Sequence, residues 1–241
     1  MKKLIAMAMA VLTTVAFATV LLTRTVVPPE PTGEHEKAQL WEGGPYWATT
    51  NIGAEKPEDY GYYFWWGDTV GYTNTGSGWI SVKDGTSISF SDSGTAASTC
   101  GKGNSALQSA GWIDSTGNLV PAHDAAHVHW GGNWRMPTKQ ELEDLNSKCD
   151  WAWTMHNGVQ GYLVKGKGTY ASASIFLPCA GYGYGTSLYH AGSDGDYRSS
   201  VPYSDSYYAW NLYFYSSGHD TYYFSRRYYG QSVRPVQGFT N

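Results

Sequence analysis

The clearest pattern in the chain is an alternation of side chains between residues 208 and 215. Successive side chains of a strand point to opposite faces, so Trp210, Leu212 and Phe214 share one face, which we expect to lie in the core. The other face carries Asn211, Tyr213 and Tyr215. Ser216 to His219 have the composition of a turn, and residues 221–227 can return as a partner strand. The pattern predicts a β-hairpin with one face buried and the other directed outward.

Two helices are predicted upstream of this hairpin. Thr138 and Glu141 form a capping box, and Leu142 and Leu145 follow at helical spacing, so a helix begins near residue 138. A shorter helix is expected over residues 123–129. Aromatic strands are expected near residues 46–50 and 62–66, with a turn at 51–53 between them. Residues 68–120 are dominated by Gly, Ser and Thr, and they predict long loops with one or two short strands.

The N-terminus divides the chain into three parts. MKK precedes an uncharged apolar run over residues 4–22, which indicates export, either as a cleaved signal peptide or as a retained membrane anchor. Residues 23–39 are rich in proline and charge and predict a linker. Residues 40–241 are long enough for one domain. We therefore expect a cell-surface, periplasmic or secreted protein that meets the membrane only through residues 1–22.

Composition narrows the chemistry. Charged residues are 15% of the chain, aromatic residues are 16% and the net charge is −4. The sequence has no basic patch, so it gives no indication of nucleic-acid binding. Three cysteines in an exported chain allow one disulfide, and the spacing does not select the pair. No G-x-S-x-G motif is present, and His123, His127 and His129 lack further ligands at zinc spacing. We expect no enzyme activity, no metal and no cofactor.

The segment from 182 to 229 has a different character. It holds 13 Tyr, 9 Ser and 4 Asp, with no Lys, Glu, Gln or Met. Antibody-like binding surfaces use this mixture because Tyr provides large contact area at small entropic cost, while Ser and Asp provide adaptable hydrogen bonds. Adjacent pairs such as Tyr207–Tyr208 and Tyr222–Tyr223 cannot both point inward from a strand. The segment therefore predicts a binding face for an unknown protein or glycan ligand.

The candidate ligand-binding residues are Tyr184, Tyr189, His190, Asp194, Asp196, Tyr203, Asp205, Tyr207, Tyr208, Tyr213, Tyr215, His219, Asp220, Tyr222, Tyr223, Tyr228 and Tyr229. Some of these side chains must turn inward because strand side chains alternate. The alternative is a structural cell-surface protein that self-associates through the same aromatic face.

Several motifs in this order resemble a known family: Trp47 to Ala54, Pro57 to Gly61, Trp130 to Thr138, Leu177 to Gly181 and Ser232 to Val236. Through these motifs, the chain resembles the Fibrobacter succinogenes major paralogous domain family. That resemblance implies an α+β, C-type-lectin-like fold in its formylglycine-generating-enzyme-like branch, with two helices, a twisted antiparallel sheet and long irregular loops.

The resemblance extends to the variable proteins of diversity-generating retroelements, which display a randomised ligand-binding face. Their varied codons keep a final pyrimidine and cannot encode Lys, Glu, Gln, Met or Trp, which fits the composition of residues 182–229 apart from Trp210. Two departures limit the resemblance. The chain lacks the E-P-N, Q-P-D and W-N-D motifs of calcium-dependent sugar binding, and no cysteine follows Cys179 to supply the catalytic pair of formylglycine-generating enzymes.

Overall fold

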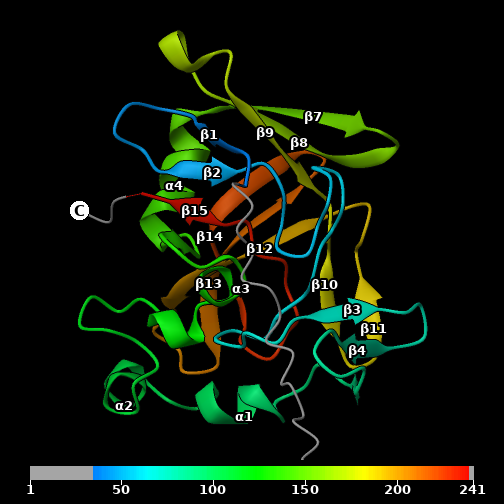
Figure 1. Cartoon of the computed structure of the whole chain (residues 1–241), viewed down its shortest axis with the longest axis vertical. Helices are drawn as coiled ribbons and strands as arrows, with labels where there is room; N and C mark the ends of the chain where they lie inside the picture. Colours follow the sequence, from blue (N-terminus) through cyan, green and yellow to red (C-terminus); the bar gives the residue numbers. More distant parts are fainter. Residues whose placement is uncertain (1–34, 239–241) are drawn as a thin grey trace, which may run out of the picture.

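The computed structural model describes residues 35–238 (Figure 1). The predicted signal peptide or anchor and most of the predicted linker lie outside the described residues. Within residues 35–238, no helix is long and apolar enough to cross a membrane. The folded part begins earlier than residue 40, because residues 37–39 form a strand at the edge of a sheet.

Five antiparallel sheets make up most of the described chain. The first joins both ends of the domain in the order β1 (Lys37–Gln39), β2 (Tyr46–Ala48), β15 (Val236–Gln237), β6 (Trp134–Arg135). The second contains β3 (Tyr72–Asn74), β4 (Trp79–Ser81) and β5 (Ser87–Ile88), and the third β7 (Asp150–His156), β8 (Val159–Lys165) and β9 (Ser174–Pro178). The fourth pairs β10 (Tyr182–Tyr184) with β11 (Ser187–Tyr189). The fifth is β12 (Gly195–Pro202), β13 (Tyr208–Tyr215) and β14 (Gly218–Arg226).

The described helices are short. They are α1 (Thr95–Thr99), α2 (Asn104–Ser109), α3 (Ala125–Trp130) and α4 (Lys139–Lys148), with 3₁₀ turns at Pro121–His123 and Gly168–Tyr170. The predicted capping box of α4 is confirmed, because the Glu141 amide donates to the Thr138 hydroxyl and the Thr138 amide donates to the Glu141 carboxylate. The shorter predicted helix is also present as α3, with Asp124 as its N-cap.

The predicted fold class is wrong. Strands and isolated bridges take 38% of the described residues and helices 16%, so the fold is mostly β, and five small sheets replace the single twisted sheet of the expected C-type-lectin-like α+β fold. Four α-helices are described rather than two. The Gly/Ser-rich stretch misled the prediction because its elements are only two to six residues long. Such elements need one or two buried side chains, here Phe90, Ala96 and Leu107, and these give no periodic signal.

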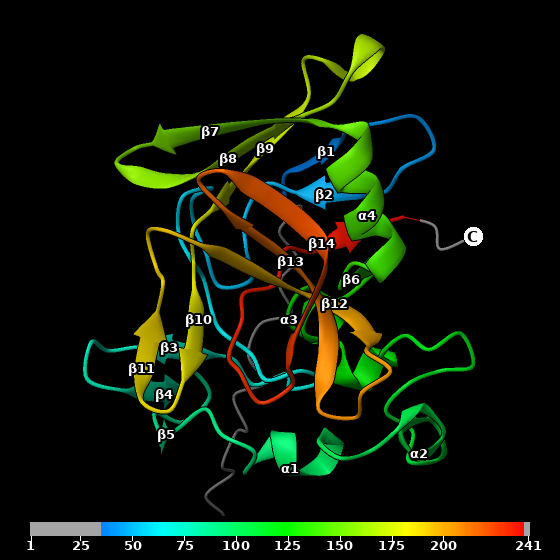
Figure 2. The same cartoon turned by 180° about the vertical axis from the view of Figure 1, so that it is seen from behind.

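The fifth sheet lies in the middle of the molecule, with α4 packed against it (Figure 2). Leu142 and Leu145 of α4 share one core cluster with Leu212 and Phe214 of β13. Burying each such side chain contributes roughly 1.5–3 kcal/mol. The core face predicted for β13 is therefore confirmed for these two residues. Trp210 departs from it, because its ring is only half-buried and lies 4.4 Å from the Lys139 ammonium.

Several smaller expectations are also settled. Residues 62–66 form two isolated bridges, to Tyr72 and Gln231, rather than a strand. Their aromatic side chains from Tyr63 to Trp66 are nevertheless buried. The three cysteines, all within the described residues, are free thiols.

Candidate ligand-binding site

The outward face of the fifth sheet carries a row of polar and tyrosine side chains. In the register of the strands, Asp196 of β12 lies opposite Tyr213 of β13, and Asn211 of β13 lies opposite both Arg198 of β12 and Tyr223 of β14. Because side chains alternate, these residues point away from the core cluster that holds Leu212 and Phe214. The same three strands thus separate a core face from a polar aromatic face.

A cleft of about 330 Å³ lies at this face. Its tyrosines are arranged in stacked pairs: the rings of Tyr213 and Tyr223 are 4.5 Å apart, and those of Tyr182 and Tyr229 are 4.8 Å apart. The residues that line it are Tyr182, His190, Asp194, Asp196, Tyr208, Tyr213, Tyr223, Phe224, Ser225, Arg226 and Tyr229. They come from β10, from the three strands of the fifth sheet and from the segments before β12 and after β14.

Close backbone packing sets one wall of the cleft. Gly183 of β10 and Gly230 exchange two backbone hydrogen bonds of 2.7 and 2.9 Å. Both glycines lie against the ring of Phe90, where an added Cβ would come within 2.5 Å of ring carbons. Only glycine lets the two backbones approach the ring and each other this closely. The packing brings Tyr182 beside Tyr229, although 47 positions of sequence separate them.

The floor of the cleft is a buried carboxyl group. Asp196 is 4% exposed, and its Oδ1 accepts hydrogen bonds from Asn211 Nδ2 (2.9 Å) and Gln231 Nε2 (3.0 Å). Its Oδ2 has no hydrogen bond to any described residue. Burial raises the pKa of Asp196 to about 7. A carboxyl group that titrates near neutral pH at the base of a cleft is a candidate functional group.

Arg198, beside the floor, has a structural role. Its guanidinium is fully buried and donates to the carbonyls of Arg226 (2.6 Å) and Tyr229 (2.8 Å). These bonds fix the segment that leads from β14 to the cleft wall. Burial lowers the pKa of Arg198 to about 9. No salt bridge within 4.0 Å joins Arg198 to Asp196 in the described part of the chain.

The rim carries further charge. Tyr213 donates its hydroxyl to Asp194 Oδ2 (3.1 Å), and His190 Nδ1 lies 3.3 Å from the same oxygen. At the opposite end of the strands, the Arg226 guanidinium lies 5.2 Å from the ring of Tyr208 and 5.3 Å from that of Tyr228. The cleft therefore has an acidic end and a basic end.

The structure brings together only part of the predicted site. Seven predicted residues line the cleft: His190, Asp194, Asp196, Tyr208, Tyr213, Tyr223 and Tyr229. Tyr184, Tyr189 and Tyr228 adjoin it through ring contacts with Tyr182 or Tyr229. Tyr203 stacks on Phe224 at 4.1 Å. The side chain of Tyr222 lies outside the described residues.

The remaining predicted residues lie elsewhere. Asp205 and Tyr207 belong to the turn before β13, where the Tyr207 amide donates to Asp205 Oδ1. Tyr215 and Asp220 are exposed near the turn between β13 and β14. His219 stacks on Trp151 at 4.4 Å and bonds to Asn146 of α4, so it helps to attach the helix.

Sequence reasoning missed the supporting residues of the cleft. Asn211 was expected to face solvent with Tyr213, but it is fully buried and bonded to Asp196. Gln231 and Arg198 were not considered. No sequence signal marks them, because their partners come from distant positions. Tyr182 and Arg226 lay inside the predicted segment and could have been added on composition alone.

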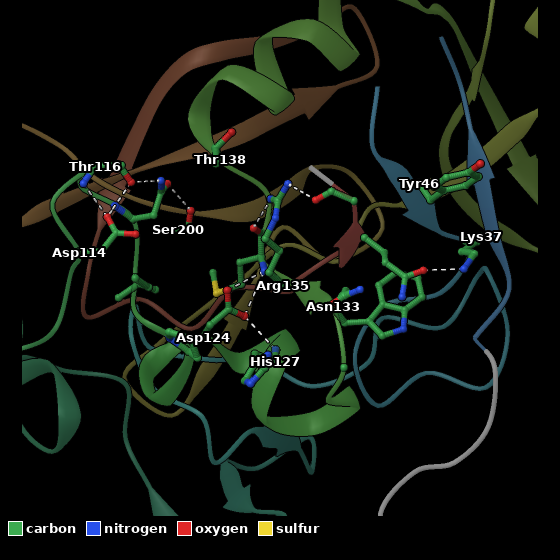
Figure 3. Close-up of a pocket in the computed structure, with 18 residues that line it drawn as sticks. Lys37, Tyr46, Asp114, Thr116, Asp124, His127, Asn133, Arg135, Thr138 and Ser200 are labelled. Atoms are coloured by element: carbon green, nitrogen blue, oxygen red, sulfur yellow. Dashed lines mark hydrogen bonds between the residues drawn. The ribbon is translucent and has the colours of Figure 1, made fainter. Parts of the chain in front are cut away.

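A larger cavity of about 780 Å³ lies near α3 and β6 (Figure 3). Its charged groups are held by the protein's own atoms. Asp124 accepts from the backbone amides of His127 and Met136, and Arg135 forms a two-bond ion pair with Glu141. Lys37 donates to Gln237 across the opening. Asp196 differs because one of its oxygens has no donor, so the tyrosine cleft is the stronger candidate.

The fold and the cleft together define a β-rich domain with an aromatic cleft and an acidic floor. Residues 135–236, less than half of the chain, match the model of a family described as a domain of unknown function (DUF8237). The matched span contains α4, all three strands of the fifth sheet and the whole cleft lining. No curated protein and no solved structure matches the chain significantly.

Proposed function

We propose that this chain is an exported ligand-binding protein whose binding surface is the tyrosine cleft and its rim. The observation that carries the proposal is the cleft itself, about 330 Å³ in volume, walled by stacked tyrosines and floored by a carboxyl group. Export is supported by the basic start and apolar run of residues 1–22.

The exposed tyrosines at the rim of the cleft, Tyr184 and Tyr223, favour a ligand-binding role over a purely structural packing role. Tyr184 is 45% exposed and Tyr223 is 48% exposed, and both rings contact other tyrosines. Large exposed aromatic patches on a monomer generally mark interaction sites. Tyrosine is suited to this role because it buries a large area while few rotatable bonds are fixed. The ligand in this proposal is a protein or glycan outside the cytoplasm.

Diversification by a retroelement is a further part of the proposal. It is supported by the absence of Lys, Glu, Gln and Met from residues 182–229, and it does not depend on the fold that the family resemblance implied. The codons for these residues and the neighbouring genes test it directly. If the varied codons lack a final pyrimidine, diversification by a retroelement is refuted, and the binding proposal is unaffected.

The binding proposal is tested with the full-length chain on arrays of immobilised glycans and peptides. We expect the double substitution Tyr184→Ser, Tyr223→Ser to abolish selective binding. Tyr46→Ser is the matched control, because Tyr46 is 42% exposed but belongs to β2 at the larger cavity. Binding that survives the double substitution and is lost in Tyr46→Ser would assign recognition to the larger cavity and refute the proposal.

A further inference from the structure

The floor of the cleft has more hydrogen-bond acceptors than donors. Both amide NH₂ groups beside Asp196, from Asn211 and Gln231, donate to the same carboxylate oxygen. Asn211 Oδ1 and Gln231 Oε1 are buried without a hydrogen-bond partner, and so is one donor beside them, Arg198 Nε. The hydrogen bonds that Asp196 accepts from described side chains both go to Oδ1, which leaves Oδ2 as a further acceptor without a donor. Buried polar atoms are normally paired, so a group rich in donors is the complement this floor lacks.

The walls favour a positively charged group. Tyrosine faces attract cations that lie within about 6 Å of the ring centre. The protein already uses this interaction on the same surface, because the Arg226 guanidinium lies 5.2 and 5.3 Å from the rings of Tyr208 and Tyr228. The stacked rings of Tyr213 and Tyr223 stand at the acidic end, where Asp196 pairs with Tyr213 in the strand register.

The charged groups around the cleft are separated along the strands. Asp194, Asp196 and His190 belong to the acidic end, whereas Arg226 pairs with Tyr208 at the other end of β13. Five residue steps of strand between Tyr208 and Tyr213 span about 17 Å. Arg198 shares the face of Asp196 and Asn211, and its NH1 and NH2 groups donate to backbone carbonyls. Its charge favours the ionised form of Asp196 and so lowers the pKa of that carboxyl group, although burial raises it more. The negative charge of Asp194 and Asp196 is therefore not cancelled by Arg226, which lies at the other end of the cleft.

We infer that the acidic end of the cleft binds an alkylammonium group of the ligand, such as a lysine side chain presents, with Asp196 as its counter-charge. This inference rests on the proposed function and names the chemistry of the ligand. An ammonium group brings three donors and no acceptor, which complements the unpaired oxygens of the floor. The alkyl stem lies against the rings of Tyr213 and Tyr223 as lysine stems do on apolar surfaces.

The site makes binding dependent on pH. The groups that face it are His190, Asp194, Asp196 and the hydroxyls of Tyr182, Tyr213, Tyr223 and Tyr229, with Arg198 and Arg226 beyond. Burial raises the pKa of Asp196 to about 7, so the carboxylate is mostly protonated at pH 6 and mostly ionised at pH 8. A cation prefers the ionised form, so its affinity rises about tenfold between these pH values.

The test uses the full-length chain and two small probes, N-acetyl-lysine methylamide and its Nε-acetylated, neutral counterpart, followed by NMR titration of the tyrosine ring signals. We expect saturable binding of the charged probe at pH 8, about tenfold weaker binding at pH 6, and at least tenfold weaker binding of the neutral probe. Equal binding of both probes would overturn the inference. So would pH-independent binding of a methyl glycoside that exceeds that of the charged probe, which would mark a sugar site.

Two variants complete the test. Asp196→Asn is expected to lose binding of the charged probe and its pH dependence, whereas Asp92→Asn, which changes an exposed carboxylate outside the cleft, is expected to retain both. Circular dichroism establishes that each variant is folded. If Asp196→Asn binds the charged probe as the unaltered chain does, the inference fails. The array result for the tyrosine variants is independent of this outcome, so the two proposals fail separately.

Discussion

The buried carboxyl group of Asp196 predicts a fold that loses stability as pH rises. The ordinary pKa of an aspartate, 3.8, applies in the unfolded chain, and burial raises the pKa in the folded protein to about 7. Between these values the folded state binds more protons than the unfolded state, so the free energy of unfolding falls with increasing pH. The penalty is absent below about pH 4 and complete above about pH 7.

The magnitude follows from the same two values. Each pKa unit is worth about 1.4 kcal/mol, so an ionised Asp196 destabilises the fold by about 4 kcal/mol at pH 8. Water in the open cleft reduces this penalty, so we expect ionised Asp196 to lower the free energy of unfolding by about 2–4 kcal/mol. Asp196→Asn removes the charge while its carbonyl oxygen can still accept from Asn211 and Gln231.

Urea unfolding of the full-length chain at pH 5 and pH 8 measures this effect. We expect Asp196→Asn to be more stable than the unaltered chain by at least ~2 kcal/mol at pH 8, with a smaller difference at pH 5. Asp92→Asn corrects for general effects of charge, because Asp92 is exposed. A difference between Asp196→Asn and the unaltered chain that is the same at both pH values would refute the reasoning.

Three further predictions concern the scaffold and its assembly. Gly195→Ala places a Cβ 2.0 Å from the ring of Phe214, so we expect a loss of about 1–3 kcal/mol in urea unfolding; Gly78→Ala, which has open space, is the control and should change stability by less than ~0.5 kcal/mol. Arg234→Met removes the donor that binds the carbonyls of Ala48, Thr49 and Phe176 and should destabilise the fold by about 1–3 kcal/mol, measured as a fall in Tm. Gel filtration of the full-length chain over a range of concentrations should give one size, whereas growth with concentration would favour the self-associating structural protein.

Local features of the fold were predictable from the sequence. The capping box needs only Thr138 and Glu141, three positions apart, and the core positions of Leu212 and Phe214 follow from alternation within one strand, which did not hold for Trp210. Edge strand β1 was not predictable, because Lys37 and Gln39 carry no apolar signal and the strand forms by pairing with β2. Propensity cannot anticipate a strand that is specified by its partner.

The candidate site was predictable as a segment but not as a geometry. Tyrosine content located residues 182–229, yet Asn211 occupies an outward strand position that normally faces solvent. It is buried because Asp196 and Gln231, from other strands and segments, meet it on the same face. The contact of Gly183 and Gly230 over Phe90 is also nonlocal. Such contacts depend on the packed chain, so composition could indicate binding but could not identify the floor of the cleft.

The arrangement of β13 gives a physical reason why a diversified face could be tolerated here. Leu212 and Phe214 hold the strand in the core from one side, while Tyr213 presents its ring to the cleft from the other. A change at Tyr213 or Tyr223 therefore leaves the core contacts in place. Asp196 and Asn211 share the same face but are buried and bonded to each other, so a substitution at either that cannot keep this hydrogen bond disturbs the sheet. If the retroelement proposal holds, sequenced copies of the gene should vary at Tyr213 and Tyr223 and remain unchanged at Asp196 and Asn211; variation at all four positions alike would mean that the cleft floor has no fixed role.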